Sequence, residues 1–168
     1  KVGNKVVSKQ DEMIVLAVNK PRGIVCTEER RERDSIVRFL NYPVRVTYIG
    51  RLDKDSHGLL LMTNNGDIIN KMMRAANKHE KEYKVTVDKE ITEDFLKKMA
   101  SGVPILDTVT RPCTVKKIGK YTFSIILTQG LNRQIRRMCE ALGYEVKDLL
   151  RVRVMNITLD GLKDGQYR

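Results

Sequence analysis

The order of apolar and polar positions predicts short strands interspersed with helices. Apolar runs of four to six residues, or strict alternation, are typical of strands. The expected strands are 13–18, 24–27, 44–49, 59–63, 81–88, 103–107, 113–118, 121–128, 145–154 and 156–159. Two of them flank the turn Gly119-Lys120 and form an expected hairpin. In 81–88 the alternation puts Tyr83 on the inward face with Val85 and Val87.

Four helices are expected from apolar residues that recur three or four positions apart. The expected N-terminal caps are Asp34-Ser35, Asp67, Thr92 and Asn132. The second helix has the clearest stripe, which we expect to be buried: Ile68, Ile69, Met72, Met73 and Ala76. Helices mixed with hairpin-like strand pairs indicate an α+β fold with a mixed, mainly antiparallel sheet flanked by helices.

The composition indicates a soluble globular protein with an anionic partner and disfavours a metal site. The chain has 168 residues and a net charge of +11, which predicts an anionic partner, with nucleic acid favoured over a membrane surface. No apolar run is long enough to span a membrane. The three separated cysteines and two histidines do not predict a metal site, and free thiols are typical of the reducing cytoplasm.

The most informative stretch runs from Ile49 to Thr63, a charged loop between two apolar runs with a glycine at each end. One interpretation is a solvated turn. A calcium loop is disfavoured, because His57 stands where an EF-hand needs an oxygen ligand and Asn64 where it needs a bidentate glutamate. The third interpretation is a catalytic carboxylate, Asp53, which a nearby arginine would keep ionised.

A second dense stretch, 129–139, supplies such an arginine. On a helix whose stripe begins at Ile135, Arg136 lies at the edge of the apolar face, whereas Arg133 and Arg137 lie on the opposite side. An inward arginine needs a carboxylate partner, and Asp53 is available. A basic solvated helix face is the alternative. The turn 19–23 adds Lys20 and Arg22, which we expect to project from a hairpin, either into solvent or toward phosphate.

Several of these motifs together resemble the pseudouridine synthases, in the RsuA/RluF-like branch that modifies ribosomal RNA. The resemblance covers about residues 11–168. The matching segments are Gly50–Leu60, Lys81-Glu82-Tyr83, Asn132–Met138, Leu149-Leu150-Arg151 and Asn19–Gly23. Two further segments, 129–132 and 153–156, look most like the RluF group, which acts on 23S rRNA.

The resemblance implies the pseudouridine synthase fold, with two lobes and a central active-site cleft, and it implies no cofactor. It also implies that Asp53 is the nucleophile, attacking either the ribose or the base of a flipped uridine. Tyr83 would stack on that base and help to remove its C5 proton, and Arg136 would pair with Asp53. Residues implied to contact the substrate or the RNA are Arg51, Leu149, Lys20, Arg22, Asn132 and Arg133.

The resemblance also implies how the chain is organised. Residues 1–10 are expected to be a linker or the remnant of an N-terminal S4 domain, and residues 11–168 the catalytic domain, acting as a monomer. The alternatives are the same chemistry on 16S rRNA or a tRNA, a non-catalytic RNA-binding or ribosome-assembly module, and a hydrolase that releases uracil.

Overall fold

The structure of the chain is a computed structural model, which describes residues 13–27, 29, 32–131, 133–159 and 161–168, with only the backbone of residues 76–78. It divides into two compact units. The first comprises the described parts of Lys1–Arg74 and Leu159–Arg168, and the second is Ala75–Thr158. Each has its own hydrophobic cluster and is described by itself.

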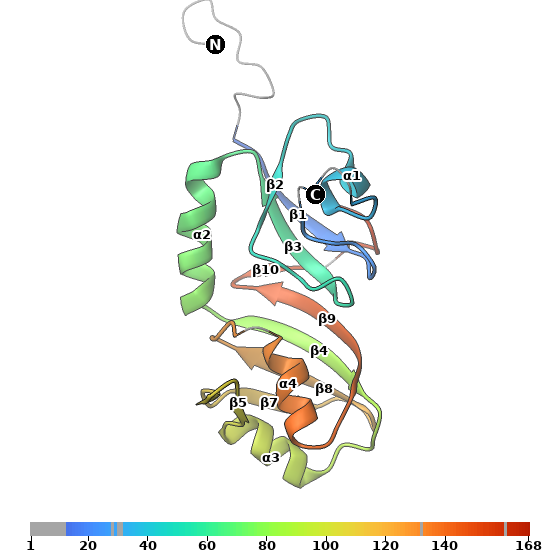
Figure 1. The fold of residues 1–168 in the computed structure, drawn as a ribbon, viewed down its shortest axis with the longest axis vertical. Helices are drawn as coiled ribbons and strands as arrows, with labels where there is room; N and C mark the ends of the chain where they lie inside the picture. Colours follow the sequence, from blue (N-terminus) through green and yellow to red (C-terminus); the bar gives the residue numbers. More distant parts are fainter. Residues whose placement is uncertain (1–12, 28, 30–31, 132, 160) are drawn as a thin grey trace, which may run out of the picture. The chain divides into compact units, whose positions relative to one another are not determined.

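The first unit is built around one central strand. Its elements are β1 (Val15–Lys20), α1 (Ile36–Leu40), β2 (Thr47–Ile49) and β3 (His57–Thr63) (Figure 1). Strand β3 pairs antiparallel with β1 and also with β2, and its residues 59–62 are almost fully buried. Ser35 caps α1 by accepting a hydrogen bond from the Arg38 N–H, which confirms the predicted cap. Between β1 and α1 the expected strand 24–27 is reduced to one bridge, Val25 with Ser35.

The last residues of the chain complete this unit by extending its sheet. Ala17 and Arg168 exchange backbone hydrogen bonds of 2.9 and 3.0 Å, and the Asn19 N–H donates to the Gln166 carbonyl. Between them, the Tyr167 ring packs edge-on against Tyr42 at 5.4 Å between centroids. The free edge of β1 is therefore covered by the chain's own C-terminal segment.

Helix α2 (Gly66–Lys78) has the predicted periodicity but not the predicted burial. None of its described side chains is buried, and none belongs to either hydrophobic cluster. The expected buried stripe is therefore wrong for its described members; Met73, for example, is 40% exposed. Its cap also differs, because Asn65 and not Asp67 provides the side-chain oxygen, accepting from the Asp67 N–H at 2.9 Å.

The second unit is an antiparallel sheet with helices on one face. Its elements are β4 (Lys81–Val87), α3 (Glu93–Ser101), β5 (Pro104–Ile105), β6 (Thr108–Val109), β7 (Thr114–Lys117), β8 (Thr122–Leu127), α4 (Gln134–Ala141), β9 (Val146–Val154) and β10 (Ile157–Thr158). Within the unit the strand order is β10-β9-β4-β8-β7, and β5 and β6 form a separate hairpin. The predicted Gly119-Lys120 hairpin and the Thr92 cap of α3 are confirmed.

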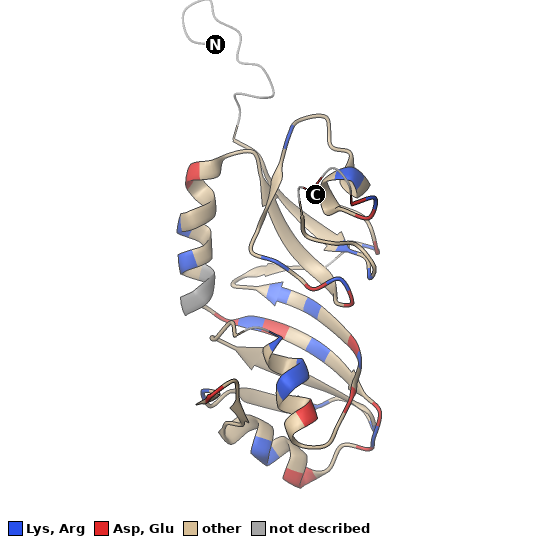
Figure 2. Ribbon diagram, viewed as in Figure 1, with Lys and Arg blue, Asp and Glu red and all other residues tan. Residues whose placement is uncertain are grey.

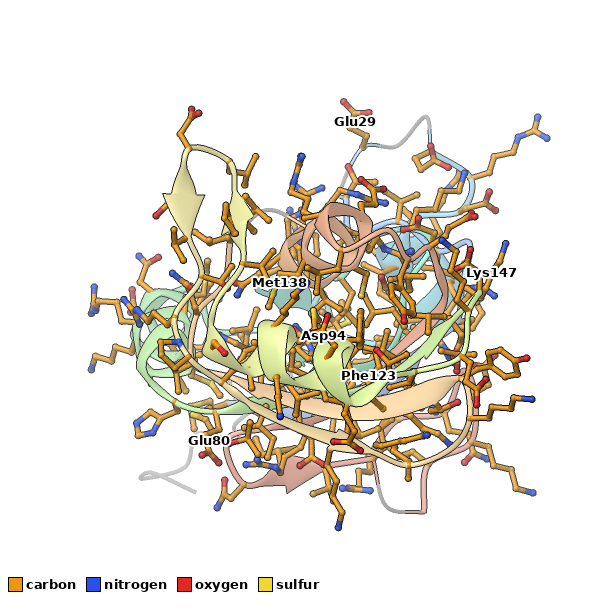
Figure 3. All side chains as sticks on the ribbon, turned by 90° about the horizontal axis from the view of Figure 1, so that it is seen from below. Glu29, Glu80, Asp94, Phe123, Met138 and Lys147 are labelled. Carbon is orange, nitrogen blue, oxygen red and sulfur yellow. The ribbon has the colours of Figure 1, made fainter. Side chains whose placement is uncertain are left out.

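The core of the second unit lies between the sheet and helices α3 and α4. Phe123 of β8 and Met138 of α4, both labelled in Figure 3, are 0% exposed. The other face of the sheet is polar, with Thr86 and Thr122 hydroxyls 3.4 Å apart. This one-sided burial explains the clean alternation seen in the sequence. No helix among the described residues is both long and apolar enough to cross a bilayer.

Candidate active site

Asp53 sits in a tight turn that the first unit holds from both sides. The turn closes with the Ser56 N–H donating to the Asp53 carbonyl oxygen at 3.0 Å, and Ser56 itself is 1% exposed. Leu52, next to the carboxylate, is buried, and its N–H donates to the Cys26 sulfur at 3.5 Å. Asp53 itself is only half-buried. The backbone is thus anchored while the carboxylate stays accessible, as a nucleophile requires.

The turn 20–24 braces this loop. The Gly23 N–H donates to the Lys54 carbonyl at 2.7 Å, and the Arg22 Nε donates to the Asp55 carbonyl at 3.3 Å. Gly23 has φ +88°, a backbone conformation that suits glycine. The Arg22 side chain is exposed.

The structure corrects the expectation for Lys20. Its side chain does not project from the turn but is 0% exposed. Its ammonium donates to the carbonyls of Pro21 at 3.0 Å and Ile24 at 2.7 Å. A buried ammonium is tolerated only with such partners, so Lys20 stabilises the turn rather than meeting RNA. Arg51, by contrast, is exposed as expected.

The second unit carries Tyr83 and Leu149. Tyr83 is half-buried and packs against the unit's core, which confirms its inward orientation. Its neighbours across the sheet are Ile125 of β8 and Arg151 of β9. Leu149 is 6% exposed and lies opposite Val85 on the same face. An aromatic ring and an aliphatic side chain on one face suit contact with a planar base.

Helix α4 presents its arginines only partly as the spacing predicted, because Arg137, which was expected to face solvent, is half-buried like Arg136. Ile135 and Met138 are buried, Arg136 is half-buried at the edge of that stripe, and Arg133 is exposed. The cap is different from the prediction: Arg133 is the N-cap residue, with φ +46°, and makes no side-chain cap. Asn132, the predicted cap, lies outside the described residues.

Gln134 is a buried residue next to Arg136 whose contacts the sequence did not reveal. It is 5% exposed, and its amide oxygen accepts from the Leu131 N–H at 3.2 Å. Its amide nitrogen donates to the Gln129 side-chain oxygen at 3.3 Å, which also accepts from the Arg111 N–H. Gln134 therefore ties the loop 129–131 to the helix of Arg136. A glutamine on a helix gives no sequence pattern that predicts burial.

No group of three or more metal-ligating side chains occurs in the part of the chain that the structure describes. The three cysteines, Cys26, Cys113 and Cys139, are free thiols. Burial raises the pKa of Cys139 to about 12 and that of Cys113 to about 11. Both therefore remain neutral thiols near neutral pH, which makes them poor nucleophiles.

A comparison with protein families shows to which family the chain belongs. A family model described as RNA pseudouridylate synthase matches residues 14–141, a span that includes Asp53, Tyr83 and Arg136. The chain belongs to the RNA pseudouridylate synthase family. The resemblance inferred from the sequence motifs is thereby confirmed. Figure 2 shows further lysines and arginines of this synthase-family chain along β4 and β9.

Similar proteins include RluF itself, as the sequence motifs indicated. The chain is 56% identical over 170 residues to the dual-specificity RNA pseudouridine synthase RluF of Escherichia coli K12, a match covering 100% of the chain and 59% of that protein. It is 35% identical to ribosomal large subunit pseudouridine synthase B of Bacillus subtilis, over 98% of the chain and 71% of that protein. The chain thus spans about three fifths of the length of the RluF proteins it matches.

A solved structure supports the pseudouridine synthase fold. A crystal structure of a pseudouridylate synthase superimposes with a TM-score of 0.83 at 30% identity, covering 94% of this chain and 70% of that one. The predicted fold class is confirmed by this similarity.

Proposed function

We propose that the chain is the catalytic domain of an RNA pseudouridine synthase that isomerises a uridine of 23S ribosomal RNA. The observation that carries the proposal is the family match across the loop of Asp53. The name of the Bacillus subtilis relative, a ribosomal large subunit enzyme, supports 23S rRNA as the substrate. The net charge of +11 supports an RNA partner.

In the proposed reaction, the Asp53 carboxylate attacks either the ribose or the uracil ring. The N1–C1′ bond breaks, the uracil rotates, and a C5–C1′ bond forms while the bond to the Asp53 carboxylate breaks. The C5 hydrogen then leaves as a proton, assisted by Tyr83, and N1 takes up a proton, so the reaction is an isomerisation without external oxidant or reductant. The target must leave its stack to react, which costs a few kcal/mol that contacts to the RNA must offset.

The remaining residues have proposed roles consistent with their places in each unit. Arg136 pairs with Asp53 and orients its carboxylate. Leu149 contacts the uracil. Arg51, Arg22 and Arg133, all exposed, bind the RNA backbone, and Asn132 assists them. Lys20 is left out of this set because it is buried in its own turn.

One observation supports a second class of RNA substrate, 16S rRNA or a tRNA. The RluF relative is named dual-specificity, so we propose that 16S rRNA or a tRNA is tested beside 23S rRNA. We also propose that the chain acts in the cytoplasm as a monomer, with residues 1–10 as a linker or the remnant of an S4 domain and residues 11–168 as the catalytic domain.

The test is tritium release from RNA transcribed with 5-tritiated uridine, because forming the C5–C1′ bond must expel the C5 hydrogen. We expect release from 23S rRNA, abolished in Asp53→Asn. Asp67→Asn, which removes an exposed carboxylate at the start of α2, is the matched control and should release tritium like wild type.

Each outcome separates one alternative. Tritium release from 16S rRNA or tRNA alone would show that this RNA, and not 23S rRNA, is the substrate. Free uracil among the products would indicate a hydrolase. RNA binding with no release, unchanged by Asp53→Asn, would favour the non-catalytic module, and an active Asp53→Asn protein would refute the nucleophile assignment.

A further inference from the structure

One short segment of the first unit bonds to the Asp53 loop on both sides of the carboxylate. The Leu52 N–H, one residue before Asp53, donates to the Cys26 sulfur at 3.5 Å. The Lys54 carbonyl, one residue after Asp53, accepts from the Gly23 N–H at 2.7 Å. A shift of the segment that contains Gly23 and Cys26 would therefore displace the backbone before and after Asp53 together.

This segment, residues 23–26, is itself anchored to the core of the first unit. The Val25 N–H donates to the Asp34 carbonyl at 2.8 Å, and the Val25 carbonyl accepts from the Ile36 N–H, also at 2.8 Å. Ile36 is the first residue of α1 and is 0% exposed. The segment therefore connects a fixed element of the core to the loop that carries Asp53.

Of the two bonds to the loop, the one from Leu52 depends on a side chain. Cys26 is 1% exposed and Leu52 is 7% exposed, and both belong to the hydrophobic cluster of the first unit. A buried thiol often serves only as a small apolar side chain, since sulfur is a weak acceptor. Here, however, it accepts from a backbone N–H, and a buried N–H that loses its acceptor is unfavourable. The Cys26 sulfur therefore does more than fill space.

We propose that Cys26 is a positioning residue for the reaction, because its sulfur orients the Asp53 carboxylate through the Leu52 N–H. The inference rests on the proposed function, since it takes Asp53 as the nucleophile. A nucleophile must approach its target to about 3–3.5 Å in the right direction, and a misplacement of about 1 Å can slow a reaction about a hundredfold. Loss of the sulfur would therefore slow the chemical step, while the exposed arginines proposed to bind RNA keep their places.

The test separates the chemical step from RNA binding. Tritium release is measured in a single turnover, with enzyme in saturating excess over the RNA that wild type modifies, and the Kd for the same RNA is measured separately. Cys26→Ala, which removes the acceptor, should release tritium about tenfold more slowly than wild type, with the Kd unchanged within about twofold. Cys26→Ser, whose hydroxyl oxygen can still accept from the Leu52 N–H, should recover most of the rate.

A matched control removes a thiol from the other unit. The Cys113 sulfur donates to the Met99 carbonyl at 3.3 Å, so Cys113→Ala also removes one sulfur and one hydrogen bond, and it should release tritium like wild type. Hydrogen exchange follows the contact directly. In Cys26→Ala the Leu52 amide should exchange faster than in wild type, while the amides of β3 keep their protection. If Cys26→Ala does not fold, Cys26→Val replaces it, because valine fills the space without an acceptor and should give the same slow release.

The inference is overturned if Cys26→Ala releases tritium within about twofold of the wild-type rate although its Leu52 amide exchanges faster. It is also overturned if Cys26→Ser is as slow as Cys26→Ala, because the acceptor would then not be what matters. In both cases tritium release by wild type would leave the proposed function standing. Absence of release by wild type would instead refute the proposed function itself, so the two failures are distinguishable.

Discussion

The amide network at the start of α4 makes a quantitative prediction. Gln134→Ala removes a buried side chain with its hydrogen bonds of 3.2 Å to Leu131 and 3.3 Å to Gln129, and its weaker one of 3.8 Å to the Met138 sulfur. A net loss of about 1 kcal/mol per bond, plus a cavity, predicts a fall of about 2–4 kcal/mol in the free energy of unfolding. Gln129→Ala should cost about 1 kcal/mol, because water can replace its contact with the Arg111 N–H.

The two substitutions should not be additive. Since the Gln129 and Gln134 amides bond to each other, either single variant already removes that bond. The double variant should therefore be more stable than the sum predicts, by about 0.5–1.5 kcal/mol. The assay is urea unfolding combined with hydrogen exchange of amides in β4 and β8. These strands belong to the same unit as α4, so their amides report on the core that the helix covers.

A control cycle tests whether the coupling is specific. Lys116 is exposed on β7, so Lys116→Ala combined with Gln134→Ala should be additive within about 0.3 kcal/mol. Additivity of the Gln129–Gln134 pair to the same precision would refute the network. A fall of less than about 0.5 kcal/mol in the free energy of unfolding of Gln134→Ala would also refute it, since removing a buried, hydrogen-bonded amide should destabilise the protein by more than that.

Three further substitutions test other parts of the structure. Gly102→Ala should lower the free energy of unfolding by about 2–4 kcal/mol in urea titrations, because φ is +119° and a Cβ would lie 2.6 Å from the Thr110 oxygen. Lys20→Met should cost about 2–4 kcal/mol by the same assay, since two buried carbonyls lose a charged donor; an unchanged value would contradict its bracing role. The pKa of Cys139 is raised from 9.0 to about 12, so its thiol ionises first in the unfolded chain and wild type should lose stability as pH rises through that window. Cys139→Ala should lose about 1.4 kcal/mol less than wild type between pH 8 and 10, while Cys113, whose pKa is also raised, contributes equally to both proteins; equal losses in both proteins would contradict the shift.

Local rules predicted much of the fold because here local and tertiary preferences agree. The Thr92 hydroxyl caps α3 as expected, accepting from the Phe95 N–H at 3.1 Å. The alternation in 81–88 gave the face of Tyr83 correctly, because the sheet is buried on one side only. The position of Arg136 at the edge of its stripe also follows from helical spacing alone.

The wrong and missed predictions share a physical cause. Each concerns a side chain whose contacts the sequence pattern does not specify. Lys20 looked like a projecting cation, and its burial depends on carbonyls that converge only once the turn 20–24 has formed. The α2 stripe has the right period, but periodicity does not say what covers a face. Gln134 was missed because its partners lie in a loop whose path cannot be read from composition.

The weak anchoring of α2 has a consequence for how the chain comes apart. Opening this helix would expose little core, since none of its described side chains is buried, and the boundary between the units follows Arg74. Lys71 and Arg74 are exposed and offer trypsin its cleavage sites. A protease would therefore cut the native chain within α2 and leave two fragments, each with its own hydrophobic cluster. Asp53 would remain on one fragment and Tyr83 with Arg136 on the other, which offers a natural position for making a split enzyme.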